Sequence, residues 1–170
     1  KEMHPYYNLS VTVLRAQNIQ GADLLSKADC YVQLKLPTAS PLPYRTKVVY
    51  NSTDPEWNET FHYRIHGAIK NILELTLYDR DLMLDDKLSA VVFDVGSIKP
   101  GQTIRRAFKL NPKHAPAQLI GQVPGQQIPV DQLLMTYPDN RSSTVFSTEN
   151  PFNLLLFKMR ITVPSVAVAS

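Results

Sequence analysis

The sequence contains a single cysteine, Cys30, among 170 residues, so an intrachain disulfide is excluded. This favours a reducing compartment and makes an extracellular immunoglobulin-like sandwich, with its intersheet disulfide, a distant alternative. Residues 1–8 contain no apolar stretch of signal-peptide length, and no segment approaches the roughly 18 continuous apolar residues of a membrane-spanning helix. We therefore expect a cytoplasmic protein whose contact with a membrane is peripheral.

Two further absences narrow the range of functions. Lys and Arg are scattered, the net charge is only +3, and the dense basic blocks typical of nucleic-acid tails are missing. No serine has the Gly-x-Ser-x-Gly flanks of a lipase nucleophile, and the histidines are isolated from one another. The sequence therefore predicts no nucleic-acid partner and no catalytic residue, so we do not expect this chain to be an enzyme by itself.

Alternation of apolar and polar residues with a period of two, typical of β-strands, dominates the first 110 residues. It is clear over 9–13, 31–36, 57–65 and 73–77, and weaker over 44–49, 88–95 and 104–110. Segments rich in Pro, Gly, Asn and Asp separate these runs, and no long helical stripe is found. Strands at such spacing predict an all-β fold, an antiparallel β-sandwich.

The remaining third of the chain is less regular. A sandwich gains from an eighth strand, and the next apolar run of strand length is 154–163. Residues 113–153 are rich in Pro, Gln, Asn and Ser, and a connection of this length indicates an insertion or a mobile loop. We expect one monomeric domain over 1–170, with a core at 7–110, a last strand at 154–163, and 113–153 as a looping or disordered insertion.

Acidic and amide side chains gather in three of the predicted turns. The first turn holds Asp23 and Asp29, the second holds Asn51 and Asp54, and the third holds Asp79, Asp81, Asp85 and Asp86. Alternate turns of an antiparallel sandwich fall at the same end, so the three groups can converge. Gathered carboxylates repel one another, and a hard cation that prefers oxygen ligands, such as Ca²⁺, relieves this repulsion. The acidic residues of any one turn, taken alone, are usually just solvated turn residues; the combination of the three turns predicts a calcium site.

Apolar side chains occupy the same turns, where polar residues are usual. Leu24 and Leu25 follow the first aspartate, and Leu82, Met83 and Leu84 lie between two acidic pairs. One interpretation is that these side chains fold back onto the core. The other is that they project from the tip of the domain and enter a bilayer once calcium offsets the surrounding negative charge.

Three segments, 23–31, 54–61 and 71–79, resemble the C2 domain, and the run Pro-x-Trp-Asn-Glu-Thr-Phe in the second is quite specific for it. More narrowly, they are similar to the amino-terminal C2 domain of the cytosolic (group IV) phospholipases A2, and Leu-Pro-Thr-Ala-Ser at 36–40 favours the delta and epsilon branch. The resemblance covers roughly 7–110. It implies an eight-stranded sandwich of C2 type with phospholipase-like topology.

The resemblance also implies a role for individual residues. Calcium ligands would be the side chains of Asp23, Asp29, Asn51, Asp79 and Asp81 and the backbone carbonyls of Lys27 and Arg80, and the membrane-inserting residues would be Leu24, Leu25, Leu82, Met83 and Leu84. Ser26 stands where the alpha enzyme of this family has a shared aspartate ligand, so the resemblance implies that one of the usual two calcium sites is weak. Asp85 or Asp86 could compensate from the third turn.

The function implied is a calcium-dependent module that binds a phospholipid membrane surface and targets a cytosolic phospholipase A2 to it. The alternative is a calcium-independent C2-like module that binds protein partners, and the serine at position 26 is a step in that direction. Lys35, Arg45 and Lys47 are open to two interpretations, as solvated strand charges or as a headgroup site.

Overall fold

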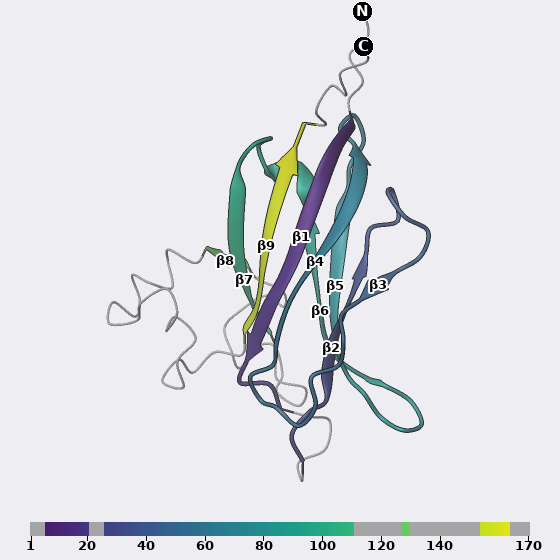
Figure 1. Ribbon diagram of the computed structural model, residues 1–170, viewed down its shortest axis with the longest axis vertical. Helices are drawn as coiled ribbons and strands as arrows, with labels where there is room; N and C mark the ends of the chain where they lie inside the picture. Colours follow the sequence, from purple (N-terminus) through teal and green to yellow (C-terminus); the bar gives the residue numbers. More distant parts are fainter. Residues whose placement is uncertain (1–5, 21–25, 111–126, 130–153, 164–170) are drawn as a thin grey trace, which may run out of the picture.

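The computed structural model describes residues 6–20, 26–110, 127–129 and 154–163, which form two antiparallel sheets packed face to face (Figure 1). One sheet has the strand order β4-β1-β9-β7-β8 and the other the order β3-β2-β5-β6. The strands are β1 (Tyr6–Gln17), β2 (Cys30–Lys35), β3 (Tyr44–Arg45), β4 (Glu56–His66), β5 (Ile72–Asp79), β6 (Asp86–Asp94), β7 (Thr103–Lys109), β8 (Gln127–Pro129) and β9 (Leu154–Thr162). A 3-10 turn, Val95–Ser97, follows β6.

The predicted all-β sandwich is confirmed, and its eight expected strands are all present. The short strand β8 is an addition that the sequence did not indicate, and it pairs with the outer edge of β7. Of the predicted insertion 113–153, only these three residues belong to the described part of the chain. Alternation identified the strands correctly because one face of each sheet is buried against the other.

The strand predicted at 44–49 is shorter than expected. Its regular pairing with β2 ends at Arg45, and one isolated bridge from Cys30 to Val49 continues the contact. Between them the side chain of Thr46 takes over, because its Oγ1 accepts a hydrogen bond from the backbone N–H of Val32 at 3.0 Å. A side-chain hydroxyl in place of a backbone carbonyl interrupts the ladder, which periodicity alone does not reveal.

The core lies between the sheets and is closed by aromatic side chains. Phe157 of β9 packs on Phe108 of β7 at a ring distance of 5.0 Å and on Phe93 of the opposite sheet at 5.7 Å. Trp57, from the Pro-x-Trp motif, is buried and donates its indole N–H to the Cys30 carbonyl at 3.2 Å. This hydrogen bond joins β4 to β2 across the sandwich, so the motif supplies a link between the sheets.

The last strand fills a central position. β9 pairs with β1 on one side and with β7 on the other. All of its residues from Leu154 to Phe157 are buried, as are Met159 and Ile161. Leu154 also pairs in register with Lys109 of β7, so β7 and β9 form a hairpin whose connection is residues 110–153.

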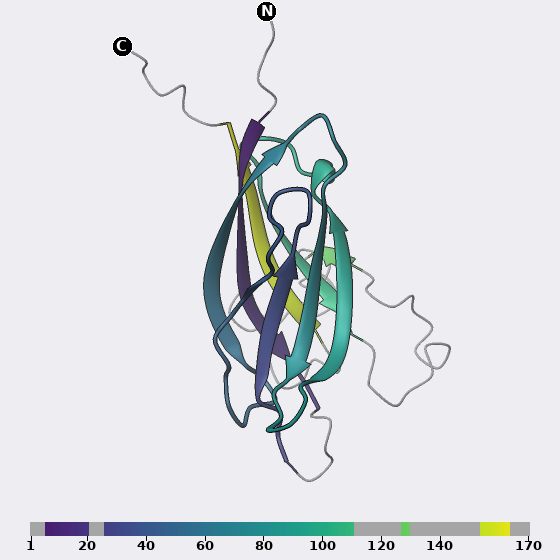
Figure 2. The ribbon, with the colours of Figure 1, turned by 90° about the vertical axis from the view of Figure 1, so that its right-hand side faces the viewer.

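The strand directions place three connections at one end of the sandwich (Figures 1 and 2). We call these loop 1 (residues 18–29), loop 2 (46–55) and loop 3 (80–85); they join β1 to β2, β3 to β4, and β5 to β6. The first residue of β1 and the last of β9 lie at the opposite end, where Asn8 pairs with Thr162. The end that carries the three loops is the one where the acidic residues were predicted to converge.

Candidate functional site

Asp29 connects the three loops. Its Oδ1 accepts a hydrogen bond from the backbone N–H of Asn51 in loop 2 at 2.7 Å. Its backbone N–H donates to the Oδ1 of Asp79 at 2.9 Å, and its carbonyl accepts from the backbone N–H of Arg80 at 2.8 Å. Asn51 has a φ of 52°, a left-handed conformation that asparagine tolerates well. The structure therefore brings together three of the sequence-predicted site residues, Asp29, Asn51 and Asp79.

Loop 3 is held in shape by its own carboxylates. The Oδ1 of Asp85 accepts from the backbone N–H of Asp81 at 3.0 Å, and the Oδ1 of Asp81 accepts from the backbone N–H of Leu82 at 2.6 Å. The hydroxyl of Tyr31 donates to the other oxygen of Asp85. The Tyr31 hydrogen bond, followed by that of Asp81, holds the pKa of the Asp85 carboxyl below its usual range. Asp85 therefore braces the loop whether or not it contacts a metal.

Leu82, Met83 and Leu84 project into solvent. Their exposed fractions are 102%, 94% and 81%, the three highest among the large apolar side chains of the described residues. This excludes the interpretation that they fold back onto the core. Three consecutive exposed apolar side chains are unusual on a protein surface, and such a patch is typical of surfaces that contact another molecule.

Not every predicted residue can be placed. Asp23, Leu24 and Leu25 lie outside the described residues, while Ser26 and Lys27 are exposed on the part of loop 1 that leads to Asp29. Within the described residues no three His, Cys, Asp or Glu side chains are grouped closely enough to hold a metal ion. The carboxylates that hydrogen bonds bring together at this junction are those of Asp29 and Asp79, with the backbone of Asn51 beside them.

Sequence reasoning missed an aromatic and cationic cluster beside loop 3. Tyr31 of β2 stacks on Tyr78 of β5 at a ring distance of 5.3 Å, and the Arg45 guanidinium lies 4.4 Å from the centre of the Tyr31 ring. Burial, together with the Asp85 hydrogen bond, raises the pKa of Tyr31 to about 12, so its hydroxyl stays a donor. The alternation of Tyr31 with buried Val32 is the one signal that could have placed this side chain on the outer face.

Cys30 is buried, follows Asp29 in the chain and pairs with Asp79 across the β2–β5 ladder. Burial raises the pKa of its thiol to about 12 from 9.0, and the charges of Asp79 and Asp29 add to this effect. Because the folded pKa is raised, the folded state favours the neutral thiol. This preference for the neutral thiol contributes to the free energy of unfolding. The contribution is fully present below the pKa of the unfolded thiol and is lost as the pH rises from about 9 towards about 12.

We expect the Cys30 thiol to react with a disulfide reagent at least about 100-fold more slowly in the folded protein than in denaturing urea, in mildly alkaline solution. The reason is that the folded protein shields the buried thiol from the reagent and, by raising its pKa, keeps it protonated. Absorbance of the released thiol measures both rates. Equal rates in the two states would contradict the position of Cys30 in the structure.

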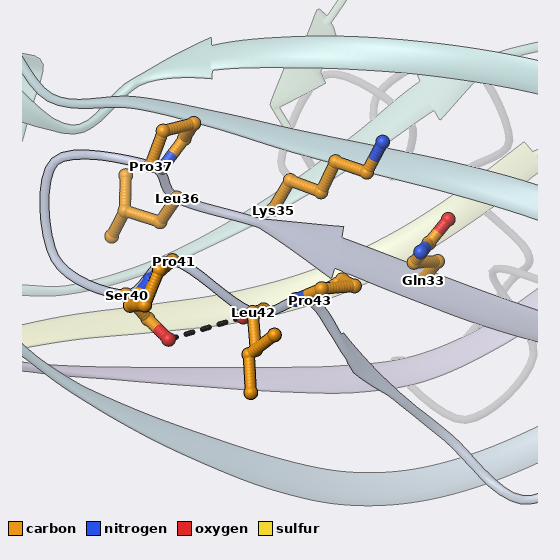
Figure 3. A pocket seen from close by; sticks show the side chains of 8 residues that line it. All are labelled: Gln33, Lys35, Leu36, Pro37, Ser40, Pro41, Leu42 and Pro43. Atoms are coloured by element: carbon orange, nitrogen blue, oxygen red, sulfur yellow. Dashed lines mark hydrogen bonds between the residues drawn. The ribbon is translucent and has the colours of Figure 1, made fainter.

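A separate hollow of about 360 Å³ lies at the opposite end of β2, under the connection to β3 (Figure 3). Gln33 and Lys35 of β2 line it together with Leu42 and Pro43, and the Ser40 hydroxyl donates to the Leu42 carbonyl at 3.0 Å. Of the three basic residues considered from the sequence, only Lys35 lines this hollow. It lies away from the three loops and does not belong to the candidate site.

The sandwich, its strand order and its cluster of acidic loops at one end define a C2 domain. The C2 domain family model matches residues 7–110, and the chain belongs to this family. In the described residues no helix is long and apolar enough to traverse a bilayer.

Among known proteins, human cytosolic phospholipase A2 zeta is 53% identical over 146 residues, which cover 81% of this chain and 17% of that protein. Mouse cytosolic phospholipase A2 delta is 47% identical over 118 residues, which cover 65% of this chain and 14% of that protein. The predicted resemblance to the C2 domains of cytosolic phospholipases A2 is thus confirmed, and the chain spans about a sixth of the length of these relatives.

Solved structures agree. Human GIVD cytosolic phospholipase A2 superposes with a TM-score of 0.68 at 29% identity, over 97% of this chain and 17% of that one. A C2 domain of plant extended synaptotagmin 1 superposes with a TM-score of 0.65 at 18% identity, over 94% of this chain and 97% of that one. The second likeness concerns the fold alone.

Proposed function

We propose that this C2 domain binds Ca²⁺ between its three loops and then docks on a phospholipid membrane, so that it targets a cytosolic phospholipase A2 to that surface. The observation that carries the proposal is the exposure of Leu82, Met83 and Leu84 immediately beside the junction that Asp29 forms. Apolar side chains next to carboxylates can enter a bilayer only when the negative charge is offset.

The donor set fits a hard cation. Asp29 and Asp79 offer carboxylate oxygens, Asn51 offers an amide oxygen, and Asp81 stands at the start of the exposed loop; the backbone carbonyls of Lys27 and Arg80 and the side chains of Asp23 and Asp85 complete the proposed set. Calcium, when bound, would supply the positive charge that neutralises this end. Neither Asp29 nor Asp81 forms an ion pair with a Lys or Arg of the described residues. One structure of human GIVD cytosolic phospholipase A2 contains terbium chloride, a salt of another hard cation.

The proposal is tested by sedimentation with vesicles of phosphatidylcholine and phosphatidylserine. We expect the domain in the pellet with calcium and in the supernatant with a chelator, as a monomer in both cases by light scattering. Binding that is equal under the two conditions would reject calcium dependence. Salt screens the interactions of surface charges but has little effect on the burial of apolar side chains, so binding should survive moderate salt.

The alternative, a calcium-independent module for protein partners, has one observation in its favour: the described residues contain no group of three His, Cys, Asp or Glu side chains that could hold a metal ion. The serine at position 26, where the resemblance implies an aspartate, points the same way. Calorimetric titration with calcium separates the two functions. An absence of heat, together with an unchanged melting temperature at saturating calcium, would favour the alternative.

A charge-only substitution at Asp29 gives a sharper prediction. In Asp29→Asn the Oδ1 acceptor for the Asn51 N–H is retained, so we expect the free energy of unfolding to change by about 1 kcal/mol or less. Calcium affinity should fall at least about tenfold, because a charged ligand is lost. Calorimetry and thermal unfolding measure the two quantities.

The matched control is Asp94→Asn at the opposite end of the sandwich. The Oδ1 of Asp94 also accepts a backbone hydrogen bond, from Gly96 at 2.9 Å, and the substitution removes the same charge. It should leave calcium affinity unchanged. A similar loss of affinity in both variants would mean that net charge, and not ligation at Asp29, determines calcium binding.

A further inference from the structure

The outer face of the five-stranded sheet carries a polar hollow that the calcium loops do not use. It has a volume of about 270 Å³ and is lined by Ser10, Thr12, Thr60, Thr103, Lys158 and Arg160. The strands β1, β4, β7 and β9 each contribute to it. These side chains point away from the core, because the residues that alternate with them, such as Val11, Phe157 and Met159, are buried.

The strand register arranges the lining in two rows. In one row His62, Ser10, Arg160 and Thr103 are successive partners across β4, β1, β9 and β7; in the next row the partners are Thr60, Thr12, Lys158 and Arg105. Short hydroxyl side chains form the floor, and the two long cations rise from β9. The Thr12 and Thr60 hydroxyls share a hydrogen bond of 2.8 Å, which fixes part of that floor.

The positive charge of this hollow is not balanced from within the described chain. Neither Lys158 nor Arg160 forms an ion pair with a described residue, and no carboxylate lines the hollow. Arg105 lies directly across from Lys158 on β7, and like charges opposite one another destabilise a sheet. Three cations are therefore held together at a cost that a bound anion would offset.

We propose that this hollow, which we call the outer-sheet site, binds a phosphate group. Arginine offers a planar fork of donors that matches two phosphate oxygens, lysine adds a point charge, and hydroxyls of Thr60 and Thr103 can donate to a third oxygen. The group can belong to the phosphorylated headgroup of a lipid or to a soluble phosphate ester. Both present the same chemistry to these side chains.

The outer-sheet site is independent of the calcium loops. Lys158 lies four residues along β9 from Leu154, which corresponds to about 14 Å from the loop end of the strand. An anion bound there would lie on the flank of the domain and not at its tip. The site can therefore be studied with a chelator present, when no calcium is available to the three loops.

The test uses inositol trisphosphate as a soluble probe, titrated by calorimetry into the domain with a chelator present. We expect saturable binding to the wild type and at least about tenfold weaker binding to the double variant Lys158→Gln with Arg160→Gln. The matched control is Lys70→Gln with Lys87→Gln, two exposed lysines that do not line this hollow; it removes the same net charge and should retain the affinity. Thr60→Val, which keeps the side-chain shape, should weaken binding several-fold.

A second arm distinguishes the two sources of the phosphate. Calcium-free sedimentation with phosphatidylcholine vesicles that contain phosphatidylinositol bisphosphate, lost in the double variant, would assign the site to a lipid headgroup. Binding of the soluble probe without vesicle binding would assign it to a soluble ester; either result supports the site.

The proposal is overturned if the probe does not bind the wild type. It is also overturned if the control pair loses as much affinity as the Lys158 and Arg160 pair, since the net positive charge of the domain would then explain binding without a specific site. Calcium-dependent sedimentation with vesicles that lack phosphoinositide should be the same for the double variant and the wild type. That comparison verifies folding and keeps this result separate from the fate of the proposed calcium function.

Discussion

Replacing Leu82, Met83 and Leu84 together with serine is expected to weaken calcium-dependent vesicle binding by on the order of 100-fold, because even partial burial of three such side chains contributes a few kcal/mol. All three side chains are almost fully exposed, so their removal costs the folded domain no packing. The hydrogen bonds that shape loop 3 come from Asp81 and Asp85 and do not involve the apolar side chains beyond the Leu82 backbone. Calcium affinity in solution should therefore stay near that of the wild type.

The measurement is vesicle sedimentation at increasing lipid concentration, with calcium calorimetry on the same samples. The matched control replaces Leu42, another leucine that is largely exposed (72%), with serine. Leu42 lies at the opposite end of the sandwich, so the control should bind vesicles normally. Unchanged binding in the triple variant, combined with loss of binding in moderate salt, would favour a purely electrostatic calcium bridge.

Truncation after residue 110 is expected to abolish the folded monomer, because it removes the strand between β1 and β7. Six apolar side chains of β9 are buried, and their transfer from water contributes on the order of 10 kcal/mol, comparable to the whole stability of a typical domain. The truncated sheet would also present two unpaired edges, of β1 and β7, that promote aggregation. Circular dichroism and gel filtration measure the outcome.

A single substitution tests the same packing in the full chain. Phe157→Ala should lower the free energy of unfolding by about 3–5 kcal/mol, since the ring is fully buried between Phe93 and Phe108. Tyr50→Ala removes an aromatic ring that is 61% exposed and should cost far less. A stable truncated monomer, or equal effects of the two substitutions, would mean that β9 does not complete the core.

The strands could be predicted where burial repeats every second residue, as along 57–65 of β4 and 91–94 of β6. The exception at β3 arises because Thr46 supplies a hydroxyl where the ladder needs a carbonyl, and a sequence pattern does not specify which acceptor is used. The last strand was found from its apolar composition despite the long preceding connection. Its central position between β1 and β7 depends on pairing across that connection, which local sequence does not determine.

The candidate site was predictable in its residue types but not in its detailed contacts. Alternating turns placed Asp29, Asn51 and Asp79 at one end, as the structure confirms. The hydrogen bond of Tyr31 to Asp85 joins two positions 54 residues apart, and nothing in the spacing of either residue indicates it. The exposure of Leu82, Met83 and Leu84 separated two interpretations that composition left open, because an apolar turn residue has the same composition whether it lies on the core or in solvent.

The pairing of Asn8 with Thr162 at the end remote from the loops has a mechanical consequence. A force that pulls the first residue of β1 and the last residue of β9 apart opens the β1–β9 ladder from this end one pair at a time, so the resistance at each step is small. A force that draws Thr162 away from loops held on a surface acts along β9 and loads its ladders with β1 and β7 in shear, all at once. The sandwich is thus compliant to peeling and stiff along its long axis, the axis on which an anchored tip would be pulled.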